Sequence, residues 1–203
     1  MKSIFFYHRH ANLLVENDSD FQLDYKELIS VINSISDQDL IEKFNQRKSE
    51  RQNIKSLSEP INNLLKTKLT QLGWKSESSL FKEPPYNQGN RSRWRLDFAK
   101  NKISIEVAFN HQEATAHNIM KPVLASELNH VKKDVQTEIG VIIVATDKMK
   151  KMGNFDSAIG TFEKFQEYFK PYHNLITVPI VLIGLCAPET FKIDKDSKKI
   201  ISF

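Results

Sequence analysis

Hydrophobic and polar positions predict helices through most of the first third of the chain. Apolar side chains recur at helical spacing over residues 24–35, and a charged stretch over 37–55 and residues 59–72 continue the helical pattern. Pro60 lies in the first turn of the last segment and Gly73 follows its end, positions that favour these residues at helix termini.

After Trp74 the pattern changes to short strands alternating with helices. The expected strands cover residues 79–81, 94–98, 103–109, 139–145 and 178–186, and the expected helices cover 114–135 and 155–168. The second and third strands are close enough to form a hairpin. This alternation predicts an α/β fold with a mixed central β-sheet flanked by helices.

The composition favours one domain and a reducing compartment. With 203 residues and 40% hydrophobic side chains, the chain can bury a single core, divided here into a helical part (1–73), an α/β core (74–188) and a tail (189–203). The lone cysteine, Cys186, excludes a disulfide framework, and no apolar segment is long enough for a signal or membrane span. We therefore expect a soluble cytoplasmic protein.

Charge and glycine usage narrow the function classes only slightly. The net charge of +4 favours polyanionic partners, although many proteins that never bind nucleic acid share this bias. The six glycines are scattered, which argues against a phosphate-binding loop of the nucleotide-binding folds.

The segment from Asp97 to Ala108 contains the candidate chemistry. Side chains alternate along a strand, so Ile103, Ile105, Val107 and Phe109 share one face while Ser104, Glu106 and Ala108 share the other. The tight turn before this strand brings Asp97 to the same end of the sheet as Glu106. Two such carboxylates can bind a divalent cation that activates water for phosphodiester hydrolysis, whereas spacing alone favours two solvated strand residues.

The same segment resembles the active-site hairpin of type II restriction endonucleases of the BglII and BstYI kind, with BamHI more distant, in the PD-(D/E)xK superfamily. Asp97-Phe98, a short basic turn and the strand from Ile105 to Phe109 carry the likeness. Further similar segments lie on both sides of this hairpin in the family's order, at residues 72–75, 149–168 and 178–185. The resemblance therefore covers residues 58–188.

The resemblance implies a restriction-endonuclease core and a Mg²⁺-dependent deoxyribonuclease that cuts double-stranded DNA at a palindrome related to GATC-centred sites. Asp97 and Glu106 correspond to metal ligands, and Glu77 corresponds to an upstream acidic or polar residue of the catalytic set. Ala108 departs from the family, which has Lys, Gln or Glu there. A nearby residue takes over that role, or the chain is an impaired DNA-binding protein of the same fold.

DNA contacts are expected from two regions. The loop that would enter the major groove contains groups that can pair with base edges, and a basic rim with two polar residues borders the metal site. The candidates are Lys150, Lys151, Asn154, Asp156 and Ser157 in the loop, and Arg93, Arg95, Asn110 and His111 near the hairpin, with Arg91, Lys100 and Lys102 completing the rim. Each could equally be a solvated polar residue, and Asp156 or Ser157 a helix cap.

Cleavage of both strands of a palindrome predicts a homodimer, because the two strands are related by a dyad. Ile119, Met120, Val123 and Leu124 form an apolar stripe with Leu128 and Val131 on the helix expected after the catalytic strand. This stripe could contact a partner, or it could belong to the core.

Overall fold

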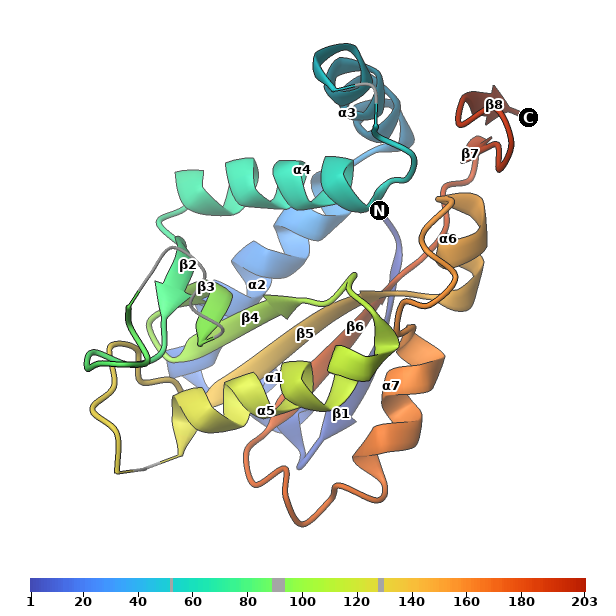
Figure 1. The fold of residues 1–203 in the computed structure, drawn as a ribbon. Helices are drawn as coiled ribbons and strands as arrows, with labels where there is room; N and C mark the ends of the chain where they lie inside the picture. The colour runs from blue at the N-terminus through green and yellow to red at the C-terminus, as the bar shows by residue number, and fades with distance from the viewer. Residues whose placement is uncertain (52, 89–93, 128–129) are drawn as a thin grey trace.

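The computed structural model describes residues 1–51, 53–88, 94–127 and 130–203. Its centre is a six-stranded mixed sheet with the strand order β1-β6-β5-β4-β3-β2 (Figure 1). These strands are β1 (Ser3–His8), β2 (Lys75–Ser79), β3 (Arg95–Lys100), β4 (Ile103–Val107), β5 (Ile139–Ala145) and β6 (Ile180–Leu185). Strands β4, β5 and β6 are parallel, and the other three pair antiparallel to their neighbours.

Helices cover both faces of this sheet (Figure 1). They are α1 (Ala11–Asn17), α2 (Ser19–Ser34), α3 (Asp37–Glu50), α4 (Ser58–Gln71), α5 (Thr115–Ser126), α6 (Asp147–Met152) and α7 (Phe162–Phe169), and a 3-10 turn, η1 (Gln112–Ala114), precedes α5. A small hairpin of β7 (Phe191–Ile193) and β8 (Ile200–Ser202) ends the chain. The predicted α/β class with a mixed central sheet is confirmed.

Alternation along the buried strands separates two cores. Val141 and Ile143 of β5 pack in the cluster formed with α1, α2, α3 and α4, whereas Ile142 and Val144 pack in the cluster formed with α5 and α7. Strand β4 follows the same rule, because Ile105 belongs to the first cluster. The face assignment expected for β4 is therefore correct.

The helical interpretation of the N-terminal part was incomplete. Residues Ser3–His8 form β1, which pairs antiparallel with β6 at the edge of the sheet. Only His8 of this strand is buried, and Phe5 is 37% exposed, so no buried face is marked by an alternation of apolar and polar residues. A strand of this kind is identified by the strand with which it pairs, and its own sequence pattern does not predict it.

The helix expected over residues 114–135 ends at Ser126. Beyond it the chain is extended beside Phe81, with the N–H of Asp134 donating to Leu80 O at 2.8 Å. Val131 and Val135 pack against a third cluster that contains Leu80 and Phe81. Their i, i+4 spacing matches a helical pattern, which is why a helix was predicted there. The segment predicted as a helix over 155–168 also differs, since α6 precedes it and α7 begins only at Phe162.

No helix in the described part of the chain is long and apolar enough to cross a membrane.

Close packing between Gly140 of β5 and Pro122 fixes where α5 lies on the sheet. A Cβ at position 140 would be 2.3 Å from Pro122 Cβ. We expect Gly140→Ala to lower the free energy of unfolding by about 1–3 kcal/mol, measured by urea denaturation, because the helix must shift to relieve the overlap. Gly73→Asn is the control, since nothing lies within 4 Å of a Cβ there and asparagine tolerates the φ of +85°. Equal stabilities would contradict this packing.

Candidate active site

Three acidic side chains lie in one row across β2, β3 and β4. The pairs Ser76↔Phe98 and Ser78↔Leu96 place Glu77 opposite Asp97, and the pair Phe98↔Ile105 places Asp97 opposite Glu106. Residues opposite each other in an antiparallel pair share a face of the sheet. The hairpin therefore brings Asp97 and Glu106 to the same end of the sheet, as the turn between their strands predicts.

Asp97 fills a gap in the ladder between β3 and β4. Its Oδ2 accepts a hydrogen bond from the N–H of Val107 at 2.6 Å, and the recorded pairing of the two strands ends at Phe98↔Ile105. Burial raises the pKa of Asp97, while the hydrogen bond from Val107 and the charge of Lys121 act in the opposite direction. The carboxylate is held by the backbone and keeps Oδ1 as a further acceptor.

Glu106 is buried rather than exposed. Only 2% of the residue is accessible, because α5 covers this face of β4. Burial, and then the negative charge of Asp97, raise the pKa of Glu106 to about 8, although Lys121 acts against this shift. The alternative of a solvated strand residue is therefore wrong for Glu106.

Lys121 of α5 is the partner of Glu106. Its Nζ lies 2.5 Å from Glu106 Oε1, with the two side chains 13% and 3% exposed. Glu106 Oε2 is buried, and the structure records no hydrogen-bond partner for it within the described ranges. An unpartnered carboxylate oxygen next to a second carboxylate is an arrangement that a hard cation would complete.

Glu77 is at the solvent-exposed end of the row. Its side chain is 56% exposed, its φ is +54°, and its Oε1 lies 3.8 Å from Nζ of Lys66 on α4. Glu77 and Asp97 line a cavity of about 100 Å³ between the sheet and α4, together with Asn62, Lys66, Ser76, Phe98 and Val107. This cavity opens Glu77 and Asp97 to a ligand, whereas Glu106 is buried beside it and does not line it.

The residues present suit Mg²⁺ held by few protein ligands. Among the residues that the structure describes, no three His, Cys, Asp or Glu side chains come close enough together to form a metal cage. Magnesium is commonly bound by one or two carboxylates, with water and substrate oxygens completing the shell. Asp97 and Glu106 fit this requirement, and the described residues do not bring Glu77 together with them as a three-residue metal group.

Ala108 is fully buried in the cluster formed with α5 and α7, and its N–H donates to Ile143 O at 2.8 Å. Its methyl group faces the side of the sheet on which Glu106 meets Lys121. The sequence predicts only that a nearby residue could replace the one missing at position 108, and it does not single out Lys121. The signal available was helical spacing, since Lys121 is three residues beyond the buried Asn118.

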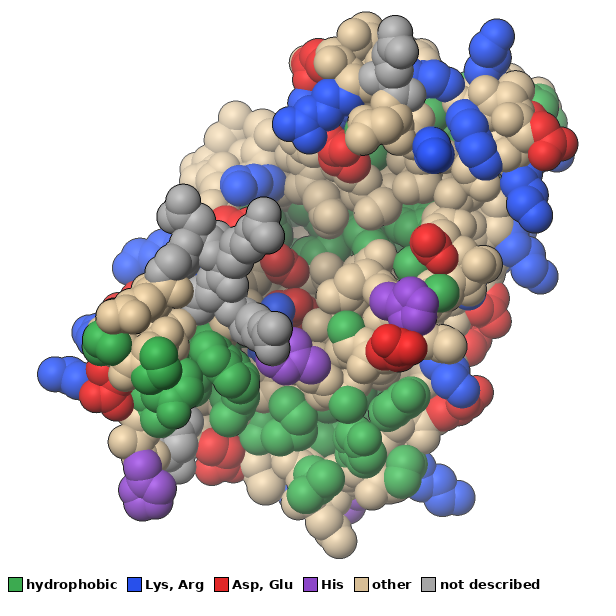
Figure 2. All heavy atoms as spheres, in the orientation of Figure 1, with side chains coloured by type: hydrophobic (Ala, Val, Ile, Leu, Met, Phe, Trp, Pro, Cys, Tyr) green, Lys and Arg blue, Asp and Glu red, His purple; other side chains and the backbone are tan. Residues whose placement is uncertain are grey.

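The expected recognition segment lies beside the end of β4. His111 bridges to Ile159, and the N–H of Gln112 donates to Ala158 O at 2.7 Å. Within the segment, Lys150 and Lys151 belong to α6, and Ser157 is exposed. The space-filling view shows a hollow across this face with acidic side chains inside it (Figure 2).

Several polar groups proposed for DNA contact already have partners inside the molecule. Asn154 Nδ2 donates to Lys55 O at 2.7 Å, Asp156 Oδ1 accepts from the N–H of Ala158 at 2.8 Å, and Asn110 Oδ1 accepts from Asn118 Nδ2 at 2.7 Å. Asp156 thus caps a turn. His111 is 54% exposed at its side chain and therefore accessible.

The basic rim differs from expectation. Arg95 is on β3 at i−2 from Asp97 and so shares its face, whereas Arg91 and Arg93 lie outside the described residues. Lys100 pairs with Glu27 at 2.6 Å, and Lys102 pairs with Asp20 at 2.7 Å. Both lysines are at the turn end of the β3–β4 hairpin, away from the acidic row, and their ion pairs attach the hairpin to α2.

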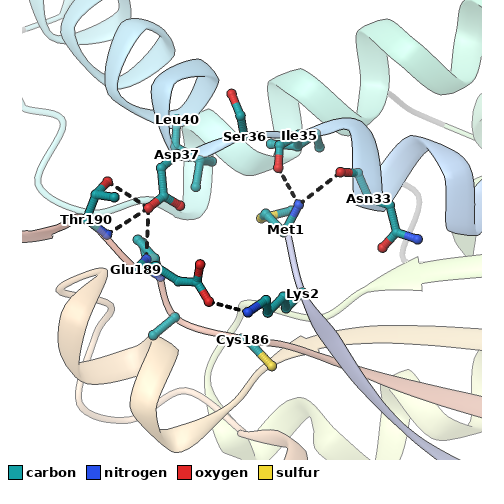
Figure 3. A pocket seen from close by; sticks show the side chains of 12 residues that line it. Met1, Lys2, Asn33, Ile35, Ser36, Asp37, Leu40, Cys186, Glu189 and Thr190 are labelled. Atoms are coloured by element: carbon teal, nitrogen blue, oxygen red, sulfur yellow. Dashed lines mark hydrogen bonds and ion pairs between the residues drawn. The ribbon is translucent and has the colours of Figure 1, made fainter.

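A larger cavity, of about 460 Å³, lies at the N-terminus (Figure 3). Its polar groups bind one another: Asp37 Oδ2 accepts from the N–H groups of Glu189 and Thr190, each at 2.8 Å, and Lys2 pairs with Glu189 at 2.5 Å. These contacts fasten the segment after β6 to the start of α3. None of the three acidic residues of the row lines this cavity.

An acidic row where two strands separate, beside a lysine and an open cleft, is suited to an enzyme that hydrolyses phosphate esters with a bound cation. The chain belongs to the BglII/BglIII restriction endonuclease family, whose model matches residues 4–185. It is therefore a site-specific DNA nuclease by family. The family match also includes the N-terminal helices, which lie outside the resemblance found over residues 58–188.

Solved structures agree with this fold. BglII in complex with a DNA 16-mer is 20% identical over all of this chain and 88% of its own, with a TM-score of 0.66. Free BglII is 16% identical over 91% of this chain and 79% of its own, with a TM-score of 0.53. A comparison with curated proteins found no match.

Proposed function

We propose that the chain hydrolyses phosphodiester bonds of double-stranded DNA at a short palindrome, with Mg²⁺ held by Asp97 and Glu106. The observation that carries this proposal is the buried Glu106 Oε2, which lacks a partner among the described residues and adjoins the carboxylate of Asp97. When bound, Mg²⁺ would lower the pKa of a water molecule and neutralise charge on the phosphate. The water oxygen bonds to phosphorus, one P–O ester bond breaks, and the leaving oxygen takes up a proton.

This chain's own groups have separate roles in that reaction. The N–H of Val107 fixes Asp97, and Lys121 fixes Glu106. These two carboxylates form the metal-binding part of the site at the end of β4. Glu77 lies at the mouth of the cleft, where it can hold a water molecule beside the site. The cleft between the sheet and α4 would receive the DNA backbone.

Incubation with plasmid and phage DNA in Mg²⁺ tests the proposal. Discrete fragments are expected, and they should not form when EDTA is present from the start. Sequencing the fragment ends gives the site, for which a GATC-centred palindrome is the first candidate. A gel shift without cutting would favour the alternative, an inactive DNA-binding protein with Ala108 as its defect. Lys121 supports the active alternative, because it brings an amine to the face left empty by Ala108.

Recognition is assigned to the segment of residues 150–157, which is beside His111 and the end of β4. Lys151 is exposed in the last turn of α6. We expect Lys151→Ala to weaken DNA binding and to reduce the slope of log K against log salt by about 0.9, because one phosphate contact is lost. Titration by fluorescence anisotropy measures the slope. Lys195→Ala, in the β7–β8 turn, is the control, and an equal slope in both variants would remove Lys151 from the interface.

A two-fold symmetric dimer on DNA follows from cleavage of both strands of a palindrome. The apolar stripe of α5 is mostly core, since Ile119 is 0% and Val123 5% exposed, and Leu128 lies outside the described residues. We expect sedimentation to show twice the monomer mass on a cognate duplex. A single 23.5 kDa subunit per duplex would contradict the dimer.

A further inference from the structure

Lys121 has an environment that stability alone does not explain. Its ammonium group is largely buried against Glu106, and the carboxyl group of Asp97 belongs to the same set. An ammonium has three donors, and the recorded contact with Glu106 Oε1 accounts for one of them. A buried ion pair with incomplete hydrogen bonding is a weak source of stability, because desolvation offsets the attraction.

The backbone fixes this lysine firmly in place. Pro122 follows it and packs against Gly140, while Asn118, one turn before it, donates to Asn110 Oδ1 at 2.7 Å. Ile119 and Val123 on the same helix are buried against the sheet. These contacts hold α5 on both sides of Lys121, so the amine is directed to the acidic row by rigid elements rather than by a loop.

Position 108 brings no polar group to the face of the sheet on which Lys121 meets Glu106. Ala108 lies on the same face of the sheet as Glu106, two residues beyond it, and belongs to the same buried cluster as Ile119 and Val123 of α5. The amine on this face therefore comes from the helix and not from the strand.

We infer that Lys121 is the catalytic cation of the nuclease reaction, supplied from α5 in place of a residue at position 108. This inference rests on the proposed function. Because Lys121 holds Glu106 Oε1, Oε2 would be the oxygen left to bind a cation. The remaining donors of Lys121 would stabilise charge on the phosphate and orient the attacking water. Lysine is not a metal ligand, because an ammonium group has no lone pair.

An exchange of the two residues tests the inference. Single-turnover cleavage of a cognate duplex in Mg²⁺ is compared for the wild type, Lys121→Ala, Lys121→Arg and the exchange variant Ala108→Lys/Lys121→Ala, with Lys164→Met on α7 as a control for loss of an exposed lysine. Mn²⁺ binding without DNA, followed by its electron paramagnetic resonance signal, is the readout that does not depend on cleavage.

We expect Lys121→Ala to cleave about 10²-fold more slowly or worse, Lys121→Arg to retain part of the activity, and the exchange variant to recover at least about tenfold. Mn²⁺ affinity in all variants should stay within about tenfold of the wild type, since the metal ligands remain. Lys164→Met should match the wild type.

Four results would overturn the inference. Cleavage by Lys121→Ala within about threefold of the wild type would show that the amine is dispensable. Loss of Mn²⁺ binding together with cleavage would mean that Lys121 only maintains the fold of the site. A wild type that cuts no DNA would refute the proposed function and this inference with it. If Lys121→Ala fails to fold, Lys121→Arg and the exchange variant still decide, and an exchange variant that folds without recovering activity refutes the inference.

Discussion

Glu106→Gln is expected to lower the rate of DNA cleavage by about 10³-fold or more. The substitution keeps the shape of the side chain and an oxygen for Lys121, but it removes the charge that holds a cation beside Asp97. Loss of several kcal/mol of metal-derived stabilisation of the transition state corresponds to a rate change of this size. Single-turnover cleavage measures the effect, and gel shift without metal ions should show DNA affinity close to that of the wild type.

The same substitution should change how stability depends on pH in the absence of metal. Burial raises the pKa of Glu106 from 4.5 to about 8, so the folded state retains a proton that the unfolded chain releases within this range. The free energy of unfolding of the wild type, relative to that of Glu106→Gln, therefore falls as the pH rises from 4.5 to about 8. Thermal melting over this range measures the difference, in which the other titrating groups largely cancel.

Undiminished cutting by Glu106→Gln would remove Glu106 from the active site. Glu167→Gln is the matched control, because Glu167 is an exposed glutamate on α7 that also pairs with a lysine, Lys164. It should alter neither cleavage nor the pH dependence of melting. A similar loss of activity in both variants would point to a general effect on the protein rather than to the site.

Local patterns predicted the central strands of the sheet and their faces, because these patterns depend on neighbours in sequence. The alternation in β4 separated Ile105 from Glu106 correctly, and the apolar run of β5 gave its bounds, Ile139–Ala145. The two acids were placed at one end of the hairpin because a tight turn at Asn101 leaves little freedom in register. These inferences needed no information about distant parts of the chain.

Contacts made across the chain were not predictable in this way. Lys121 reaches Glu106 over 15 residues, and its position depends on how α5 packs on β5 through Pro122 and Gly140. Lys100 was assigned to the DNA-facing rim by its proximity in sequence to Asp97, but it pairs with acids of α2 that lie more than 70 residues away. The burial of Glu106 also depends on a distant segment. The alternation of side chains along a strand shows which residues share a face, but it does not show which helix covers that face.

Asp97→Asn is expected to abolish cleavage while leaving the fold intact, with a rate at least about 10³-fold below that of the wild type. The amide oxygen can still accept the hydrogen bond that Asp97 Oδ2 takes from Val107 at 2.6 Å. Burial already raises the pKa of Asp97, so a neutral group of the same shape costs little in stability. The loss should therefore appear in Mn²⁺ binding and in cleavage, with a melting temperature near that of the wild type.

Asp97→Ala separates the two functions of this side chain. It removes the ligand and also leaves the N–H of Val107 without its acceptor at the point where β3 and β4 part. We expect an additional loss of about 1–2 kcal/mol in the free energy of unfolding relative to Asp97→Asn, measured by urea denaturation without metal. Equal stabilities would show that the hydrogen bond does not hold the strands at this point. Both variants lack the Asp97 carboxylate, so only Glu106 would remain as a carboxylate ligand at the proposed site. Mn²⁺ binding retained by both variants would therefore place the cation elsewhere.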